Sequence, residues 1–429
     1  MVGQHGIENM KHIVRSFVTA LAAVVAAAAA SAAIVPQSPV GGAEVPLVPD
    51  AQKKVMAPQT LKERIEIFRV DREKNGKVIR HDKYWRKAKP FVLKWRTTKG
   101  EVGPWKIEIG KEPDLSDARV WYVRVNKVDA ATGRDTGEAQ SKAETTYAVP
   151  RANLEIGREY YWRVSARGRC GKWNCGPRCG CKESTKLIRS EIASFRTEDR
   201  APRWIEIEGG VGNIRDFGGW HTVDGRRVRQ GMAFRGQGLN SNSVTGEAQG
   251  HNRLTVEDVK YLKGTLGIRT DLDLRSSGET ADMVESPLGP DVAFIRNSSP
   301  AYTGIFADEG KKKTAKNFRV FCDPKTSPIY FHCIGGADRT GSLAYVMLGV
   351  LGVSRHDMET DWESTFYPKI PDDLHEKEPG FWCLEAHFNN GISKYGKEGD
   401  SWNRRVELYL IDCGITPEEI AKFRSIMLE

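Results

Sequence analysis

A ten-residue loop between two apolar runs limits the fold more than any other part of this chain. The run Ile329-Tyr330-Phe331 predicts a buried strand, and the run from Ser342 to Leu351 is long enough for a buried helix. The loop between them, His332 to Gly341, contains adjacent glycines. A strand, a glycine-containing loop and a helix N-terminus in this order form an anion site, because the loop amides and the helix dipole point at the same place.

The loop carries a thiol and a guanidinium at its two ends. Cys333 opens it and Arg339 closes it, with five residues between them. Helix N-termini and nearby cations stabilise thiolates, so a cysteine here ionises readily. A guanidinium presents a fork of N–H groups that fits two phosphate oxygens. Gly335 and Gly336 let the backbone turn its N–H groups inward. The sequence therefore predicts a nucleophilic sulfur that faces a bound phosphate group.

The pattern His-Cys, five residues, Arg-Thr-Gly resembles the signature loop of the bacterial cysteine-dependent tyrosine-protein phosphatases. A lone Cys-x5-Arg is a weak signal, but here the loop follows an ordered set of further motifs of that family. The resemblance covers residues 204–429 and implies a cysteine-phosphatase α/β fold with a parallel-type central sheet over residues 199–429. The further motifs are Asn213 to Gly219, Asp224 to Val228, Phe234-Arg235, Leu254-Thr255 and Gly267 to Ser276.

The resemblance also implies roles for the loop residues. Cys333 attacks phosphorus to form a cysteinyl-phosphate, which water then hydrolyses. Arg339 holds the phosphoryl oxygens where charge develops in the transition state. Thr340 hydrogen-bonds Cys333, caps the helix, or does both, since the two roles are compatible. His332 either fixes the loop through hydrogen bonds or is an ordinary buried histidine. The backbone amides that bind phosphate come from Ile334, Gly335, Gly336 and Ala337.

A general acid must protonate the leaving oxygen. Asp338 is the first candidate, because related phosphatases with Asp-Arg in the loop use it so. Asp273, at the end of the predicted neighbouring strand, is the second candidate. An equally good interpretation of Asp273, or of Asp271, is an ion pair with Arg275 or a hydrogen bond to a loop amide.

One departure from the family pattern bears on the substrate. The bacterial group usually has lysine where this chain has Ala337, so the site is one cation poorer. Phosphotyrosine-type monoesters are therefore favoured over highly charged inositol phosphates or phosphoinositides. Another alternative is a secreted phosphate-binding or adhesion protein with an inactive phosphatase domain. The expected partner is a phosphorylated protein or a small phosphomonoester, and no metal or cofactor is implied.

Length and charge set broader limits. The chain has 429 residues and a formal net charge of +9, which fits two folded units with a basic surface. That surface is either simply solvated or suited to anionic substrates, and no nucleic-acid-binding motif supports a nucleic-acid partner.

The N-terminus has the build of an export signal. A short cationic stretch, an alanine-rich apolar run and a small-residue site predict a signal peptide over residues 1–33. The run is short for an uncleaved anchor, so we expect no stable membrane span and a secreted or periplasmic protein. Residues 34–60 are rich in Pro, Val, Gly and Ala without periodicity, which predicts a linker.

Residues 61–198 predict an all-β domain. Short alternating segments are separated by Gly, Pro and Asp turns, as in a β-sandwich. The run from Leu154 to Val164 resembles the tyrosine-corner strand of fibronectin type III modules, and the stretches Lys111 to Asp117 and Phe195 to Thr197 resemble the same module. The resemblance implies a module that binds a protein or glycan ligand, or acts as a spacer. The alternating segments are Ile65 to Val70, Phe91 to Trp95, Trp105 to Ile109, Trp121 to Val125 and Tyr160 to Val164.

A cysteine cluster interrupts this domain. In an exported protein, Cys170, Cys175, Cys179 and Cys181 predict two disulfides, with three pairings open. A zinc site is the alternative, but the spacing lacks paired Cys-x2-Cys units and no histidine lies nearby. The remaining cysteines are spread through the C-terminal half. Cys322, Cys383 and Cys413 either pair among themselves, or one of them traps Cys333 as a reversible redox switch.

Residues 199–429 change to a mixed period. Thr255 to Asp258 predicts a capped helix start, and residues 312–322 predict a further helix. Thr270 to Leu274 predicts a strand beside Ile329 to His332 in a parallel sheet. Thr416 with Pro417 predicts the start of the last helix. The expected chain is therefore multidomain, with an all-β sandwich before an α/β domain.

Overall fold

We describe the protein from a computed structural model. It describes residues 34–57, 88–98, 105–123, 126–128, 135–139, 144–167, 187–240, 254–280, 283–365 and 388–429. The predicted signal peptide and the strand predicted at Ile65 to Val70 lie outside these ranges. So do the cluster Cys170, Cys175, Cys179 and Cys181, and Cys383.

The chain forms two compact units. Unit 1 takes in Met1–Val45, Pro90–Pro150 and Gly157–Glu198, and unit 2 takes in Pro46–Lys89, Arg151–Ile156 and Asp199–Glu429. Unit 1 ends at Glu198, and the sequence predicts a domain boundary after residue 198. Unit 2 also includes the N-terminal segment Pro46–Lys89 and the loop Arg151–Ile156, which no sequence pattern assigned to it.

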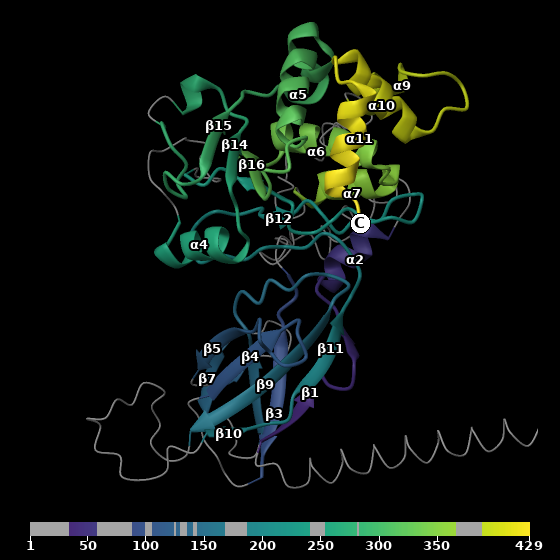
Figure 1. Ribbon diagram of the computed structural model, residues 1–429. Helices are drawn as coiled ribbons and strands as arrows, with labels where there is room; N and C mark the ends of the chain where they lie inside the picture. The colour runs from purple at the N-terminus through teal and green to yellow at the C-terminus, as the bar shows by residue number, and fades with distance from the viewer. Residues whose placement is uncertain are drawn as a thin grey trace, which may run out of the picture. The chain divides into compact units, whose positions relative to one another are not determined.

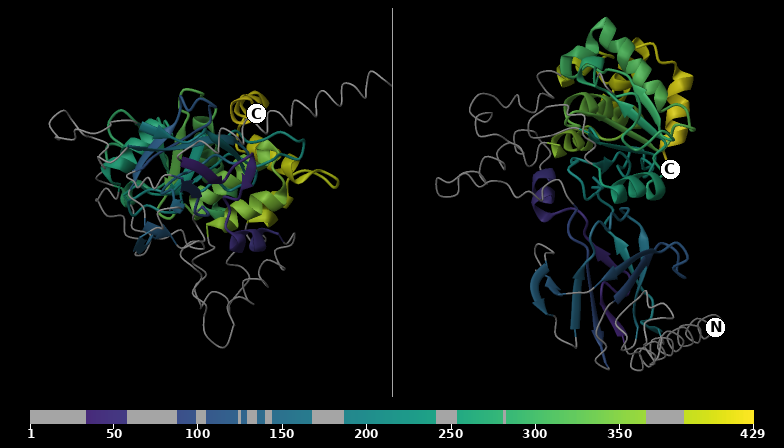
Figure 2. Two further views of the ribbon diagram at one scale, coloured as in Figure 1. Left: turned by 90° about the horizontal axis from the view of Figure 1, so that it is seen from below. Right: turned by 90° about the vertical axis from the view of Figure 1, so that its left-hand side faces the viewer.

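The described residues of unit 1 form strands in two larger sheets and one hairpin (Figure 1; Figure 2, right). The first sheet has the order β1-β3-β8, and the second has the order β2-β11-β9-β4-β5 with β10 beside β9. Strands β6 and β7 pair only with each other. The bounds are β1 Ile34–Ser38, β2 Ala43–Val45, β3 Val92–Thr97, β4 Trp105–Gly110, β5 Arg119–Val123, β6 Asn126–Val128, β7 Asp135–Ala139, β8 Glu144–Ala148, β9 Glu159–Arg167, β10 Leu187–Arg189 and β11 Ala193–Thr197.

Aromatic side chains form the core of unit 1. Trp95 on β3 meets Trp105 on β4 edge to face, with ring centroids 5.4 Å apart, so the contact joins one sheet to the other. Phe195 on β11 lies 5.0 Å from Phe91 and 5.6 Å from Tyr160. Over the described residues of unit 1, the regular elements are all strands.

The predicted linker is wrong over residues 34–57. Strand β1 pairs with β3 and strand β2 pairs with β11, each of them distant in sequence. Helix α2 (Asp50–Met56) belongs to unit 2, where the Gln52 side chain accepts a hydrogen bond from the Trp204 indole at 3.0 Å. Long-range pairing of short strands leaves little local pattern, so the composition of this segment was misleading.

A five-stranded sheet with the order β12-β13-β16-β14-β15 runs through unit 2 (Figure 1). Strand β16 lies in its centre and is parallel to both β13 and β14. The predicted parallel pairing of β14 with β16 is confirmed. The short β12 is antiparallel to β13. The bounds are β12 Arg215–Asp216, β13 Ala233–Gln237, β14 Thr270–Asp273, β15 Ala293–Arg296 and β16 Ile329–Cys333.

Helices cover this sheet, with α6 (Asp338–Leu351) at the centre of one group (Figure 1). Twelve of its residues are buried, as its apolar sequence predicted. The helices packed with it are α5 (Asp308–Val320), α7 (Arg355–Ser364), α10 (Trp402–Asp412) and α11 (Pro417–Met427). The shorter elements are α4 (Val256–Lys260) with a π turn (Tyr261–Thr265), α9 (Asn390–Ser393), and the 3-10 turns η3 (Ser277–Glu279) and η4 (Tyr302–Phe306).

Successive side chains of β16 point to opposite faces of the sheet and pack against different groups. Tyr330 joins a cluster that contains Phe234 and Leu262, whereas Phe331 meets the Phe321 ring at 5.3 Å on the side of α5. The predicted caps are confirmed: Thr255 and Thr416 both form capping boxes with the third residue of their helices. In the described part of the chain, none of the helices has the length and hydropathy needed to cross a bilayer.

Candidate active site

The loop after β16 places Cys333 in the middle of the sheet, at the carboxyl ends of parallel strands. Cys333 is the last residue of β16 and is 2% exposed. Helix α6 begins five residues later, at Asp338, so its N-terminus follows the loop directly. Gly336 has φ +67°, and its α-carbon lies against the Gly236 carbonyl of β13. The strand, loop and helix predicted from the sequence are therefore all present.

Donors from the scaffold hold the loop carbonyls. The Asn213 amide donates to the Gly335 carbonyl at 3.0 Å and to the Gly336 carbonyl at 3.3 Å. Arg235 donates to the Gly336 carbonyl at 3.0 Å. In a trans peptide the N–H group points opposite to the carbonyl. The N–H groups that follow these two carbonyls therefore point away from the scaffold, where they can bind an anion.

A buried ion cluster supports these donors. Asp361 on α7 accepts from Arg215 at 3.0 Å and forms a second, short ion pair with Arg235. Arg215 also donates to the Asn213 amide oxygen at 2.7 Å. Burial would raise the pKa of Asp361, but the two guanidinium groups outweigh it and lower that pKa. The Asn-x-Arg motif had no predicted role. In the structure its Arg215 holds the Asn213 side chain, and Asn213 in turn holds the loop carbonyls.

His332 lies under the loop between two carboxylates. Its Nε2 is 2.9 Å from Asp271 Oδ1, and its Nδ1 is 3.9 Å from Asp273 Oδ1 and 3.1 Å from the Cys333 carbonyl. Burial opposes the charged imidazole, but the two carboxylates outweigh burial and raise the pKa of His332. His332 is therefore a buried histidine with a partner on each ring nitrogen, one of them the Cys333 carbonyl of the loop.

Arg339 points at a carboxylate that the sequence did not identify. Its two terminal nitrogens bind Glu279 at 2.7 and 2.8 Å, in a fork-to-fork pair. The hydrogen bonds from Arg339 lower the pKa of Glu279 to about 2, so this carboxylate stays ionised at neutral pH. Burial opposes the charge of Arg339, but Glu279 and Cys333 outweigh it and raise the pKa of Arg339. Glu279 also closes a capping box with Ser276, the one local pattern that marks it.

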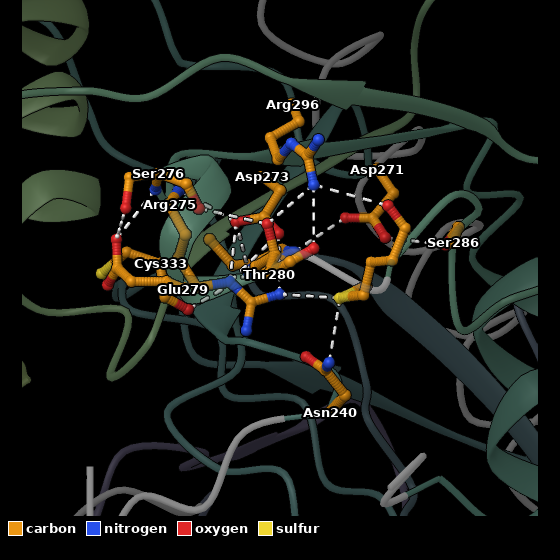
Figure 3. A network of polar contacts seen from close by, with 12 residues as sticks. Asn240, Asp271, Asp273, Arg275, Ser276, Glu279, Thr280, Ser286, Arg296 and Cys333 are labelled. Carbon is orange, nitrogen blue, oxygen red and sulfur yellow. Dashed lines mark hydrogen bonds and ion pairs between the residues drawn. The ribbon is translucent and has the colours of Figure 1, made fainter. Parts of the chain in front are cut away.

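The two candidates for the general acid lie in different environments. Asp273 is buried and is held by the side-chain and main-chain nitrogens of Arg275, with contacts of 2.7 to 3.0 Å (Figure 3). This is the ion pair that we considered for it. Asp338 is only partly buried and accepts a short hydrogen bond from the Tyr302 hydroxyl. Both carboxylate oxygens of Asp273 thus accept from Arg275, whereas the Tyr302 hydroxyl contacts Asp338 at Oδ1.

Thr340 corrects one prediction. The residue before α6 is Ala337, and it makes no side-chain cap. The Thr340 hydroxyl is buried and has no hydrogen-bond partner among the described residues. Thr340 thus neither caps the helix nor bonds Cys333 here, because it lies in the first turn of α6 and not before it. Over the same residues, Cys322, Cys333 and Cys413 are free thiols, and no group of three acidic, histidine or cysteine side chains is arranged to hold a metal ion.

Known proteins resemble this chain in its C-terminal part. A family profile described as "Tyrosine phosphatase family" matches residues 205–429, just over half of the 429 residues. A protein of Cupriavidus necator, provisionally named a tyrosine-protein phosphatase, is 28% identical and covers 42% of this chain and 69% of its own length.

Solved structures give weaker similarities. The catalytic core of the S. cerevisiae PP-IP phosphatase Siw14 matches at 16% identity over 37% of this chain and 88% of its own, with a TM-score of 0.23. TpbA of P. aeruginosa matches at 15% identity over 47% of this chain and 88% of its own, with a TM-score of 0.21. Both scores are too low to bear on the fold. The family profile, by contrast, spans the sheet, the loop and the helices of unit 2, so this chain belongs to the tyrosine phosphatase family.

Proposed function

We propose that this phosphatase hydrolyses phosphotyrosine-type monoesters through a covalent intermediate on Cys333. The observation that carries the proposal is the loop itself. Its carbonyls are held by Asn213 and Arg235, and its thiol lies at the N-terminus of α6. Such a loop offers backbone N–H groups and a helix dipole to a dianionic phosphoryl group.

The chemistry has two steps. In the first, the Cys333 thiolate forms a bond to phosphorus, the bond to the leaving oxygen breaks, and Asp338 protonates that oxygen. In the second, water attacks phosphorus, Asp338 takes a proton from that water, and the Cys333 thiolate leaves. Arg339 holds the phosphoryl oxygens in both steps, while the amides of Ile334, Gly335, Gly336 and Ala337 line the loop.

Arg339 keeps donors for this role while it is paired with Glu279. A guanidinium has five N–H groups, and the fork-to-fork pair uses two of them. Among the described residues no hydrogen bond from Nε is seen, so the Nε edge can bind two phosphoryl oxygens. Glu279 therefore anchors the arginine and does not exclude the substrate.

Substitution tests the nucleophile and the acid separately. Cys333→Ser abolishes turnover and retains vanadate binding, since only the nucleophile is changed. Asp338→Asn slows phenyl phosphate, a poor leaving group, more than p-nitrophenyl phosphate. Full activity of Cys333→Ser would remove the covalent mechanism on Cys333. Absence of turnover in the unsubstituted protein would instead favour the phosphate-binding alternative.

A substrate panel tests the specificity. The small side chain of Ala337 stands where a lysine would add a cation, so the site holds little charge for additional phosphates. We expect a higher kcat/KM for a phosphotyrosine peptide than for an inositol phosphate or a phosphoinositide. A reversed order would favour the inositol-based alternative.

We further propose that the protein is exported and that unit 1 is a fibronectin type III-like module that binds or spaces. The signal-like residues 1–33 and the tyrosine-corner-like run Leu154 to Val164 support this proposal. Fractionation of cells, with N-terminal sequencing of the mature chain, tests export. Retention of residues 1–33 in a cytosolic protein would contradict it.

A further inference from the structure

Tyr302 is tied at both ends to the first turn of α6. Its backbone N–H donates to Ser342 Oγ at 3.1 Å, and its hydroxyl donates to Asp338 Oδ1. Ser342 Oγ in turn donates to the Asp338 carbonyl at 2.8 Å. These contacts close a ring of hydrogen bonds around Asp338. The Tyr302 ring centroid also lies 5.9 Å from that of Trp362 on α7, which limits its movement.

The backbone of Tyr302 is in a conformation that bulky residues rarely adopt. Its φ is +54°, in the left-handed region. Such strain persists only where the surroundings hold it, and it gathers at functional sites. Two hydrogen bonds to α6 contribute to holding it, one directly to Asp338 and one through Ser342. This backbone conformation thus places the Tyr302 hydroxyl against the Asp338 carboxyl group.

We propose that Tyr302 is the positioning residue of Asp338, a role that rests on Asp338 being the general acid. The hydroxyl occupies Oδ1, so Oδ2 carries the proton. In the first step the Oδ2 proton passes to the leaving oxygen as its bond to phosphorus breaks. In the second step Oδ2 takes a proton from the attacking water. The Tyr302 hydrogen bond to Oδ1 is retained in both protonation states, so one oxygen always faces the reaction.

A positioning role has a signature that a structural role lacks. A leaving group that departs easily as an anion needs little help from the acid, whereas a poor leaving group depends on it. We expect Tyr302→Phe to lower kcat for phenyl phosphate about tenfold, the rate equivalent of one ordinary hydrogen bond, and that for p-nitrophenyl phosphate about twofold. The inhibition constant for vanadate stays unchanged, because the loop is intact.

The experiment uses the full-length chain and a double-mutant cycle. On the Asp338→Asn background, Tyr302→Phe should cause no further loss, because the group that it positions no longer transfers a proton. Tyr345→Phe is the matched control, because Tyr345 is a buried tyrosine of α6 itself and its hydroxyl donates to Asn389 Oδ1 at 2.8 Å. If Tyr302→Phe does not fold, Ser342→Ala replaces it. That variant removes the acceptor of the Tyr302 backbone N–H and keeps the tyrosine ring, and it should show the same leaving-group dependence.

The outcomes are distinguishable. If Tyr302→Phe slows both substrates equally, or adds its full effect to Asp338→Asn, the proposal is overturned while the general acid stands. If Asp338→Asn itself shows no leaving-group dependence, the general acid falls and Tyr302 with it. A leaving-group effect of the same size in Tyr345→Phe would also overturn the proposal, since it would reflect loosened packing.

Discussion

Gly336→Ala should disable the loop, whereas Gly335→Ala should be nearly silent. At Gly336 an added β-carbon would lie 2.3 Å from both the carbonyl carbon and the oxygen of Gly236, and φ is +67°. At Gly335 the nearest atom is the Ala337 β-carbon at 3.9 Å, an ordinary contact. The two adjacent glycines therefore make a matched pair for testing whether the loop geometry is required.

The cost at Gly336 has two parts. The left-handed backbone costs alanine about 1–2 kcal/mol. Relief of the overlap with Gly236 means that the loop must shift by roughly 1 Å, with an overpacking cost of about 1–3 kcal/mol. We expect the free energy of unfolding to fall by about 2–5 kcal/mol in total. A shift of this size in catalytic groups lowers the rate about 100-fold, because the amides no longer aim at the phosphoryl oxygens.

The assay measures kcat/KM with p-nitrophenyl phosphate, the inhibition constant for vanadate and the free energy of unfolding in urea. Gly336→Ala should lower activity and weaken vanadate binding together. Gly335→Ala should change kcat/KM by less than about threefold and stability by about 0.5 kcal/mol or less, as surface substitutions do. Equal losses in the two variants, or an active Gly336→Ala, would refute the claim that this backbone geometry binds the substrate.

Three further predictions follow from the surrounding groups. Asn213→Ala should lower kcat/KM about tenfold or more and cost about 1–3 kcal/mol of stability in urea unfolding. The reason is that the Gly335 carbonyl loses the Asn213 donor, while the Gly336 carbonyl keeps the donor from Arg235. The pKa of Glu279 falls from 4.5 to about 2 on folding, so its ion pair with Arg339 stabilises the protein above pH 4.5 and is lost as the pH falls toward 2. After a discount for solvent screening this contribution is about 1–2 kcal/mol. In Glu279→Gln the free energy of unfolding should therefore fall less steeply as the pH is lowered. Against the effect of burial, Asp273 and Asp271 raise the pKa of His332 above 6.5, so its stabilisation is complete below that pH and is lost as the pH rises through the folded-state value. Asp271→Asn should reduce this loss, and an unchanged dependence of the unfolding free energy on pH in this range would contradict the assignment.

Features with a local signature could be predicted from the sequence. The apolar runs on either side of the loop, the capping residues Thr255 and Thr416, and the strand at residues 270–273 all express their pattern within a few residues. The site loop belongs to this class, because its thiol, glycines and arginine are adjacent in sequence.

Groups that meet only in the folded chain could not be predicted. Glu279 and Arg339 are 60 residues apart, Tyr302 and Asp338 are 36 apart, and Asp361 lies 126 residues from Arg235. Each of these pairs depends on the order of strands in the sheet, which a single sequence does not fix. The polar members look like ordinary surface residues until the sheet brings them together.

The same reason explains the misassigned N-terminal segment. Strands β1 and β2 acquire their partners from distant parts of unit 1, and Gln52 meets Trp204 across 152 residues. The loop 151–156 likewise joins unit 2 through contacts such as that of the Ile156 amide with Gln230, 74 residues away. Composition alone favoured a linker, because such contacts leave no periodic pattern.

The most direct test of the central claim is to trap the intermediate. Full-length protein is mixed with p-nitrophenyl phosphate, quenched in acid within the first turnovers, digested and examined by mass spectrometry. We predict one phosphoryl group on the peptide that contains Cys333, and none on that peptide from Cys333→Ser. A phosphoryl group on a different side chain, or undiminished turnover by Cys333→Ser, would contradict the account.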